Sequence, residues 1–152
     1  MDFKKIIDLL ISRNETIATM ESCTGGGVAN AITNIPNASN VLKFSAVTYS
    51  NEYKIKMGVS SDVIDKYGVY SIETAHEMAR NISLFANSSF GVGVTGKLNE
   101  DGNDLNDVYI SIYYKDNYYD ITLHLPFDKR SNNKNVIINS IINKLEEILL
   151  NV

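Results

Sequence analysis

The fold is decided by a short apolar run that ends in a glycine-rich turn, Thr16-Ile-Ala-Thr-Met-Glu-Ser-Cys-Thr-Gly-Gly-Gly27. Residues 16–20 are few, uncharged and largely β-branched, a composition that predicts a buried strand. After the glycines, apolar residues recur at helical spacing until Pro36 ends the pattern. The stretch therefore predicts a strand, a tight turn and a helix in succession, which is a building unit of α/β folds.

The chain on both sides of this unit also alternates between helical and extended patterns. Apolar spacing predicts helices over 2–12, 51–57, 60–68, 71–85 and 135–150. Strands are predicted over 44–49, 90–95, 108–115 and 118–125, and a polar loop over 96–107. The run 44–49 is expected to be buried because it ends in uncharged residues. This order predicts an α/β three-layer sandwich with a mixed, mostly parallel sheet, helices on both faces, and a C-terminal β-hairpin followed by a helix.

Composition indicates one globular domain over residues 1–152. Hydrophobic residues make up 44% of the chain and charged residues 21%, which argues against disorder. The net charge of −4 disfavours DNA or RNA as a partner. A single cysteine excludes a disulfide framework and a Cys-based zinc site, and we expect no bound metal. Without a signal peptide or an apolar run of ~20 residues, the chain is expected to be cytoplasmic and away from membranes.

The glycine turn places three hydroxyl or thiol side chains, those of Ser22, Cys23 and Thr24, beside Gly25 and Gly26. Backbone amides at the start of a helix point outward, and they suit a phosphate or the oxyanion of an acyl-transfer intermediate. The alternative is a tight turn in which a serine or threonine caps the helix. The residues alone leave both interpretations open.

The strand predicted over 44–49 ends in a second polar cluster, Thr48-Tyr-Ser-Asn-Glu-Tyr-Lys54. Neighbouring parallel strands open their carboxyl ends into one crevice, so Ser22 is expected to meet Tyr49 and Lys54 there. Burial lowers the pKa of a lysine, which makes Lys54 a candidate base for a Ser22 nucleophile. The Tyr49 hydroxyl would relay a proton or hold the lysine. The alternative places Lys54 on a solvated helix face beside Lys56.

Five motifs follow one another along the chain: Ala-Thr-Met-Glu-Ser-Cys-Thr-Gly-Gly (18–26), Val-Thr-Tyr-Ser-Asn-Glu-x-Lys (47–54), Met-Gly-Val (57–59), Tyr-Gly-Val-Tyr-Ser-x-Glu-Thr-Ala (67–75) and Gly-Val-Thr-Gly (93–96). On these motifs the chain resembles the C-terminal domain of the competence/damage-inducible CinA family over nearly its whole length. Stand-alone members of that family are nicotinamide-mononucleotide amidohydrolases. Many relatives also carry a larger amino-terminal domain.

The resemblance implies hydrolysis of the nicotinamide-mononucleotide carboxamide to nicotinate mononucleotide and ammonia, in pyridine-nucleotide salvage and without a cofactor. It implies that Ser22 is the nucleophile and that Lys54 and Tyr49 assist it. The substrate-binding residues implied by the match are Cys23, Thr24, Gly25, Gly26, Thr95, Gly96 and Arg130. Related proteins commonly associate, so the resemblance also implies a homo-oligomer, with the tyrosine-rich hairpin as a possible dimer face.

One segment departs from the family pattern. The family usually has Ile-Ala-Gly-Pro-x-Gly-Gly after Val-Thr-Gly, whereas this chain reads Lys97-Leu-Asn-Glu-Asp-Gly-Asn-Asp-Leu-Asn-Asp107. We expect the acidic segment 97–107 to line the pocket and to repel a phosphate. Neutralising Asp101 and Asp104 should then lower the KM for the nucleotide. Lys134 also stands where a second arginine is usual after Arg130. The departure favours a second hypothesis, a catalytically degenerate relative that binds a nucleotide or a protein partner without turnover.

Two further features of the sequence have competing interpretations. Cys23 is either the nucleophile or a small buried residue beside it. The run 101–107 resembles a calcium loop, but it lacks the glycine and the glutamate that such a loop requires at its sixth and twelfth positions, so we reject that interpretation.

Overall fold

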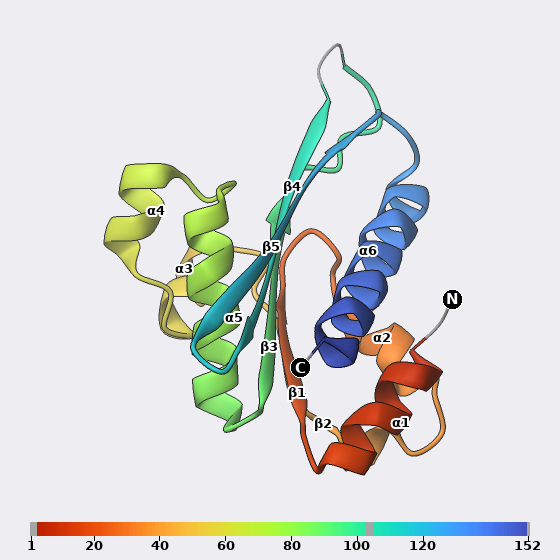
Figure 1. Ribbon diagram of the computed structural model, residues 1–152. Helices are drawn as coiled ribbons and strands as arrows, with labels where there is room; N and C mark the ends of the chain where they lie inside the picture. The colour runs from red at the N-terminus through yellow and green to blue at the C-terminus, as the bar shows by residue number, and fades with distance from the viewer. Residues whose placement is uncertain (1–2, 103–104, 152) are drawn as a thin grey trace.

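The computed structural model describes residues 3–102 and 105–151. Its strands are β1 (Ile17–Glu21), β2 (Leu42–Val47), β3 (Phe90–Gly96), β4 (Asn106–Tyr114) and β5 (Asn117–Leu125). Its helices are α1 (Lys4–Arg13), α2 (Gly27–Thr33), α3 (Asn51–Lys56), α4 (Ser61–Tyr67), α5 (Ile72–Ala86) and α6 (Arg130–Leu150), with a 3-10 turn over Ala38–Asn40. The sheet lies between α1, α2 and α6 on one face and α3, α4 and α5 on the other (Figure 1).

The strands form one sheet in the order β2-β1-β3-β4-β5. β1 pairs in parallel with both β2 and β3, whereas the pairs β3–β4 and β4–β5 are antiparallel. The predicted three-layer α/β sandwich with a mixed sheet and a C-terminal hairpin followed by a helix is thereby confirmed. Because β1, β2 and β3 run in the same direction, their carboxyl ends meet at one edge, where the chain leaves the sheet at Glu21, Val47 and Gly96.

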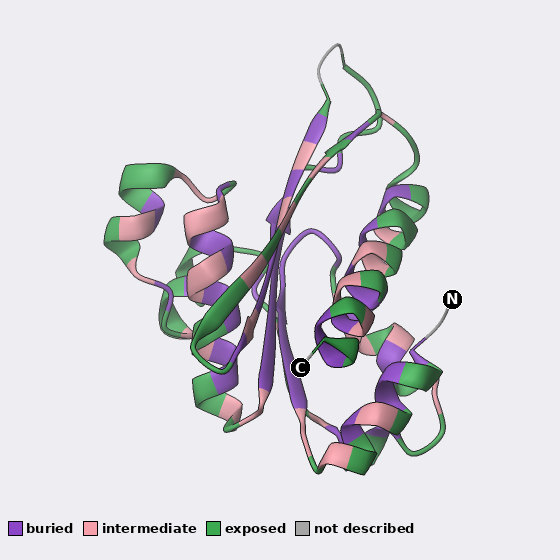
Figure 2. Cartoon of the chain, viewed as in Figure 1, coloured by how far each residue is buried: buried purple, intermediate pink, exposed green. Residues whose placement is uncertain are grey.

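Two apolar cores hold the helices on the sheet. The larger core joins the sheet to α1, α2 and α6, and a smaller one lies under α5. Figure 2 shows the buried residues concentrated in the strands and on the sheet-facing sides of the helices. α5 packs very closely on β3, because a Cβ at Gly91 would lie 2.0 Å from the Ala79 carbonyl oxygen and one at Gly93 would lie 2.5 Å from the Ala75 carbonyl oxygen. These two positions therefore require glycine.

Two predicted elements differ from the structure. The strand expected over 44–49 runs from Leu42 to Val47, and none of its residues is fully buried. It forms the edge of the sheet and pairs only with β1, so its lack of charge does not indicate burial. The last helix begins at Arg130 and not at 135, since its first turn is polar and carries no apolar periodicity. None of the described helices is long and apolar enough to cross a membrane.

Candidate active site

The turn between β1 and α2 is organised by the buried carboxylate of Glu21. One oxygen accepts hydrogen bonds from the Thr24 hydroxyl (2.7 Å) and the Val28 amide (2.9 Å). The other accepts from the Ala29 amide (2.9 Å) and the Thr19 hydroxyl (3.1 Å). The carboxylate thus satisfies the first amides of α2 and complements the positive end of its dipole. The Val28 and Ala29 amides at the start of α2 are therefore bonded by a side chain of the protein and are not available to a ligand.

Replacing this carboxylate should destabilise the fold. The amide of Glu21→Gln places an NH₂ group where two donors now point, leaving buried partners unsatisfied. We expect a loss of about 2–4 kcal/mol in the free energy of unfolding, measured by urea denaturation. The matched control is Glu52→Gln, because Glu52 is exposed and forms an exposed ion pair with Lys56. That change should cost less than about 0.5 kcal/mol. Equal effects of the two substitutions would contradict this role for Glu21.

Ser22 and Lys54 meet where β1 and β2 end. The Ser22 amide donates to the Val94 carbonyl (3.0 Å), which fixes the serine beside β3. Lys54 lies on α3, whose start is capped by the Ser50 hydroxyl accepting from the Tyr53 amide. The Lys54 amine donates to the Thr48 carbonyl (2.7 Å) and lies 3.1 Å from the Ser22 Oγ. The predicted juxtaposition of this serine and this lysine is therefore present.

The Lys54 amine is held in an environment that favours its neutral form. The side chain is only 2% exposed. In the described ranges 3–102 and 105–151, no carboxylate forms an ion pair with it. Burial lowers the pKa of the Lys54 amine below its ordinary value, because a charged ammonium loses its hydration there. The alternative of a solvated Lys54 is wrong, whereas Lys56 does have an exposed side chain.

Burial also favours the neutral form of the neighbouring Cys23 thiol, and for a thiol the neutral form is the unreactive one. The Cys23 thiol is 6% exposed, and burial raises its pKa to about 12, with the nearby Glu21 carboxylate acting in the same direction. A thiol with this pKa is almost wholly protonated at neutral pH and is a poor nucleophile. Of the two neighbouring candidates, Ser22 alone has a base within hydrogen-bond distance in the described part of the chain. The structure thus agrees with Cys23 as a small buried residue.

Two adjoining cavities, together called the active-site cleft, lie above this pair. One, of about 130 Å³, is lined by Ser22 and Lys54, and the other, of about 170 Å³, by Lys97 and Arg130. Both cavities are lined by a shared set of residues, Cys23, Tyr49, Tyr70 and Gly96. The cleft therefore opens from a buried serine–lysine pair toward two cationic side chains.

Tyr49 lies in the cleft but faces a different partner from the one expected. Its side chain is 62% exposed, and its hydroxyl accepts a hydrogen bond from the Arg130 guanidinium at 3.2 Å. The structure gives the Lys54 amine two other partners, Ser22 and Thr48, so Tyr49 does not hold the lysine here. Tyr49 instead orients Arg130 at the start of α6.

Some of the other predicted binding residues line the cleft, and the rest lie in neighbouring segments that do not line it. Thr24, Gly25 and Gly26 form the turn beneath the cleft and do not line it, although the Lys134 amine lies 3.5 Å from where a Cβ on Gly25 would be. The buried Thr95 hydroxyl donates to the Val69 carbonyl (2.9 Å) and so fixes the segment that carries Tyr70. Sequence reasoning missed Tyr70 and Lys97. Tyr70 could have been found within the motif 67–75.

The acidic segment lines the outer part of the cleft with Lys97, Leu98 and Asn99, and none of its described carboxylates lines the cleft. A Glu100 oxygen accepts from the Arg130 amide at 3.3 Å. Asp107 instead contacts the His124 imidazole at 2.6 Å, Asp101 is exposed, and Asp104 lies outside the described residues. The described residues contain no group of histidine, cysteine and acidic side chains suited to a metal.

The sheet topology and this pair define an α/β domain with a buried serine–lysine contact at the carboxyl ends of its parallel strands. The chain belongs to the CinA C-terminal domain family, whose model matches residues 3–149. A protein named competence-damage inducible protein in Clostridium novyi (strain NT) is 38% identical over 138 residues, covering 88% of this chain and 33% of that protein. The chain thus spans about a third of the length of that curated relative.

Solved structures show the same fold. A CinA superfamily protein from Escherichia coli is 23% identical with a TM-score of 0.87, covering 95% of this chain and 87% of that chain. Another, from Klebsiella pneumoniae, is 19% identical with a TM-score of 0.91, covering 98% of this chain and 96% of that chain.

Proposed function

We propose that this chain is a serine amidohydrolase that converts nicotinamide mononucleotide and water to nicotinate mononucleotide and ammonia. The observation that carries the reaction class is the 3.1 Å contact between the Lys54 amine and the Ser22 Oγ, in a buried setting that lowers the pKa of the lysine. The nucleotide as substrate is supported by the family to which the chain belongs and by the cations of the cleft.

The reaction proceeds in two half-reactions at the same pair. Neutral Lys54 takes the Ser22 proton, and the serine oxygen attacks the carboxamide carbon to form a tetrahedral intermediate. We assign the stabilisation of its oxyanion to the amide of Cys23, the residue after the nucleophile. The Lys54 ammonium protonates the leaving nitrogen, the C–N bond breaks, and ammonia departs. A water then attacks the acyl-serine, Lys54 accepts its proton, and return of that proton to the Ser22 oxygen releases the carboxylate.

The cations of the cleft orient the substrate phosphate. Arg130 and Lys97 line the outer cavity, and Lys134 lies against the turn below it. Arg130 is fixed by the Tyr49 hydroxyl, so its guanidinium is held ready for an anion. Tyr49 thus assists catalysis, as the family resemblance implies, by orienting Arg130. We further propose that the protein is cytoplasmic and, as the family resemblance implies, that it forms homo-oligomers.

The proposed function is tested by product analysis of the purified protein with nicotinamide mononucleotide. We expect ammonia and nicotinate mononucleotide in a one-to-one ratio. Calorimetric binding of the nucleotide without release of ammonia would instead establish the degenerate relative. If the protein shows neither binding nor turnover of nicotinamide mononucleotide, this nucleotide is not its substrate.

The acidic segment should weaken phosphate binding through Glu100. Glu100→Gln removes one negative charge beside Arg130, and we expect it to lower the KM for nicotinamide mononucleotide about two- to fivefold, as for an exposed charge pair. The effect should shrink with added salt, because exposed charges are screened. Nicotinamide riboside lacks the phosphate and should be unaffected. Asp101 lines neither part of the cleft, so Asp101→Asn is the matched control here and is no longer expected to lower the KM. Equal effects of both substitutions on both substrates would show that this segment does not act on the phosphate.

A further inference from the structure

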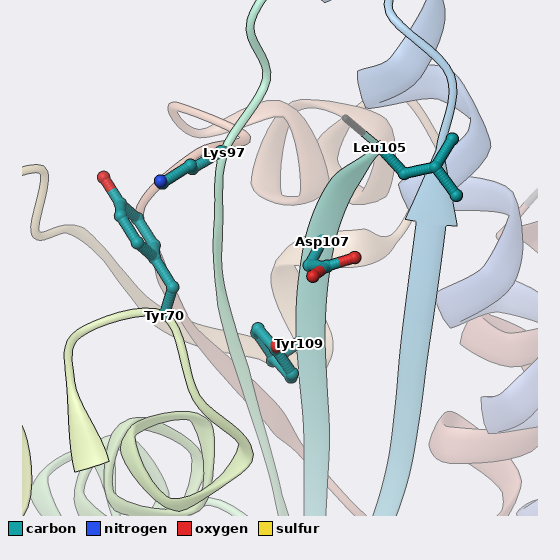
Figure 3. A pocket seen from close by; sticks show the side chains of 5 residues that line it. All are labelled: Tyr70, Lys97, Leu105, Asp107 and Tyr109. Atoms are coloured by element: carbon teal, nitrogen blue, oxygen red, sulfur yellow. The ribbon is translucent and has the colours of Figure 1, made fainter. Parts of the chain in front are cut away.

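A larger cavity adjoins the active-site cleft and has no part in the mechanism above. This outer pocket has a volume of about 650 Å³ and is lined by Tyr70, Lys97, Leu105, Asp107 and Tyr109. Figure 3 shows Tyr70 and Lys97 side by side at one end, with Asp107 and Tyr109 along β4. Its volume lies within the range of roughly 300–1,000 Å³ typical of small-molecule sites, whereas each part of the cleft is smaller.

The outer pocket and the cleft are joined through common walls. Tyr70 lines the outer pocket and both parts of the cleft, and Lys97 lines the outer pocket and the outer part of the cleft. The Lys97 amine lies 5.3 Å from the centre of the Tyr70 ring, at this junction. One ligand can therefore extend from Ser22 past these two side chains into the outer pocket.

The side chains of the outer pocket suit a flat ring that carries an N–H donor. Tyr70 and Tyr109 provide aromatic faces for stacking, and Leu105 adds an apolar contact. One Asp107 oxygen contacts the His124 imidazole at 2.6 Å, and among the described residues the other oxygen has no partner, so it can accept a hydrogen bond from a ligand. A purine with an exocyclic amine has this chemistry.

The order of groups along the connected cavities is that of a dinucleotide. The Ser22–Lys54 pair lies at the inner end, Lys97 and Arg130 follow, and Tyr109 and Leu105 line the outer end, whereas Tyr70 lines all three cavities. A carboxamide, a phosphate linker and an aromatic base would meet these groups in that order. A mononucleotide leaves the last of them unused.

We propose that the outer pocket binds the second, aromatic nucleotide of a dinucleotide, so that the site also takes nicotinamide adenine dinucleotide. The inference rests on the proposed function, because the step is the same. One water is consumed, the carboxamide C–N bond is replaced by a C–O bond, and ammonia leaves. The pyrophosphate and both sugars remain intact.

The test compares two substrates in the wild-type protein and in Tyr109→Ala. Tyr109 lines the outer pocket and neither part of the cleft. We expect the wild type to release ammonia from both the mononucleotide and the dinucleotide. Tyr109→Ala should lower kcat/KM for the dinucleotide about tenfold, the size of one lost base–tyrosine stacking contact, and change it less than about twofold for the mononucleotide. Tyr113→Ala, four residues along β4, is the matched control and should affect neither substrate.

Each outcome decides the inference. Release of ammonia from the mononucleotide but not the dinucleotide overturns it and leaves the proposed function standing. Equal losses for both substrates in Tyr109→Ala also overturn it. If neither substrate reacts, calorimetry with adenosine diphosphate decides: binding to the wild type that weakens about tenfold in Tyr109→Ala supports the pocket, and absence of binding refutes it.

Discussion

Replacing Ser22 with alanine is expected to lower kcat for nicotinamide mononucleotide by a factor on the order of 10⁴ or more, because the attacking oxygen is lost. The fold should survive, since the hydroxyl is small and its partner in the structure is the Lys54 amine. The change in the free energy of unfolding should be about 1 kcal/mol or less. Ammonia release under saturating nucleotide measures the first effect, and urea denaturation measures the second.

The control for this experiment is the neighbouring thiol. Cys23→Ala should keep most of the activity, because burial raises the pKa of Cys23 to about 12 and the thiol is protonated at neutral pH. If Cys23→Ala is inactive and Ser22→Ala is active, the nucleophile is the Cys23 sulfur.

Replacing Lys54 with methionine is expected to remove activity to a similar extent while keeping the length of the buried side chain. In the wild type, the neutral amine is the active form, so kcat/KM should rise with pH through the pKa of Lys54 and level off above it. Burial lowers that pKa, so kcat/KM should increase at a pH below the ordinary pKa of a lysine. The pH profile of kcat/KM from about pH 5 to pH 10 measures this.

Lys56→Met serves as the matched control, because Lys56 lies two residues away with an exposed side chain paired with Glu52. It should leave both the rate and the pH profile nearly unchanged. Similar mild effects of both substitutions would show that Lys54 is not the base. A circular dichroism spectrum of Lys54→Met separates loss of the base from loss of the fold.

Most of the fold could be predicted because its elements carry strong apolar patterns. α5 repeats its buried residues at helical spacing, and β3 is buried along its whole length. The burial predicted for β2 was wrong, because an uncharged run does not distinguish a central strand from an edge strand. The start of α6 was missed because Asn133, which is buried there, bonds the Pro126 carbonyl, a polar contact that no apolar period indicates.

The serine–lysine pair could also be predicted, because parallel neighbouring strands bring their carboxyl ends together. The role of Glu21 could not, since an acidic residue after a strand does not reveal the four donors that surround its carboxylate. The outer pocket depends on the register between β3 and β4, which pairs Thr95 with Tyr109. That register is set where β4 pairs with β3 in the folded sheet, so the sequence alone did not identify Tyr109 as a pocket residue.

The most direct test of the central claim, that Lys54 activates Ser22, is labelling with a serine-reactive sulfonyl fluoride. Peptide mass spectrometry after treatment of the wild type locates the adduct, and its rate of formation is followed against pH. We predict one adduct on the Ser22 oxygen, forming faster as pH rises through the lowered pKa of Lys54, and almost none in Lys54→Met. An adduct on Cys23 in place of Ser22, or equal labelling of Ser22 in the wild type and in Lys54→Met, would contradict the account.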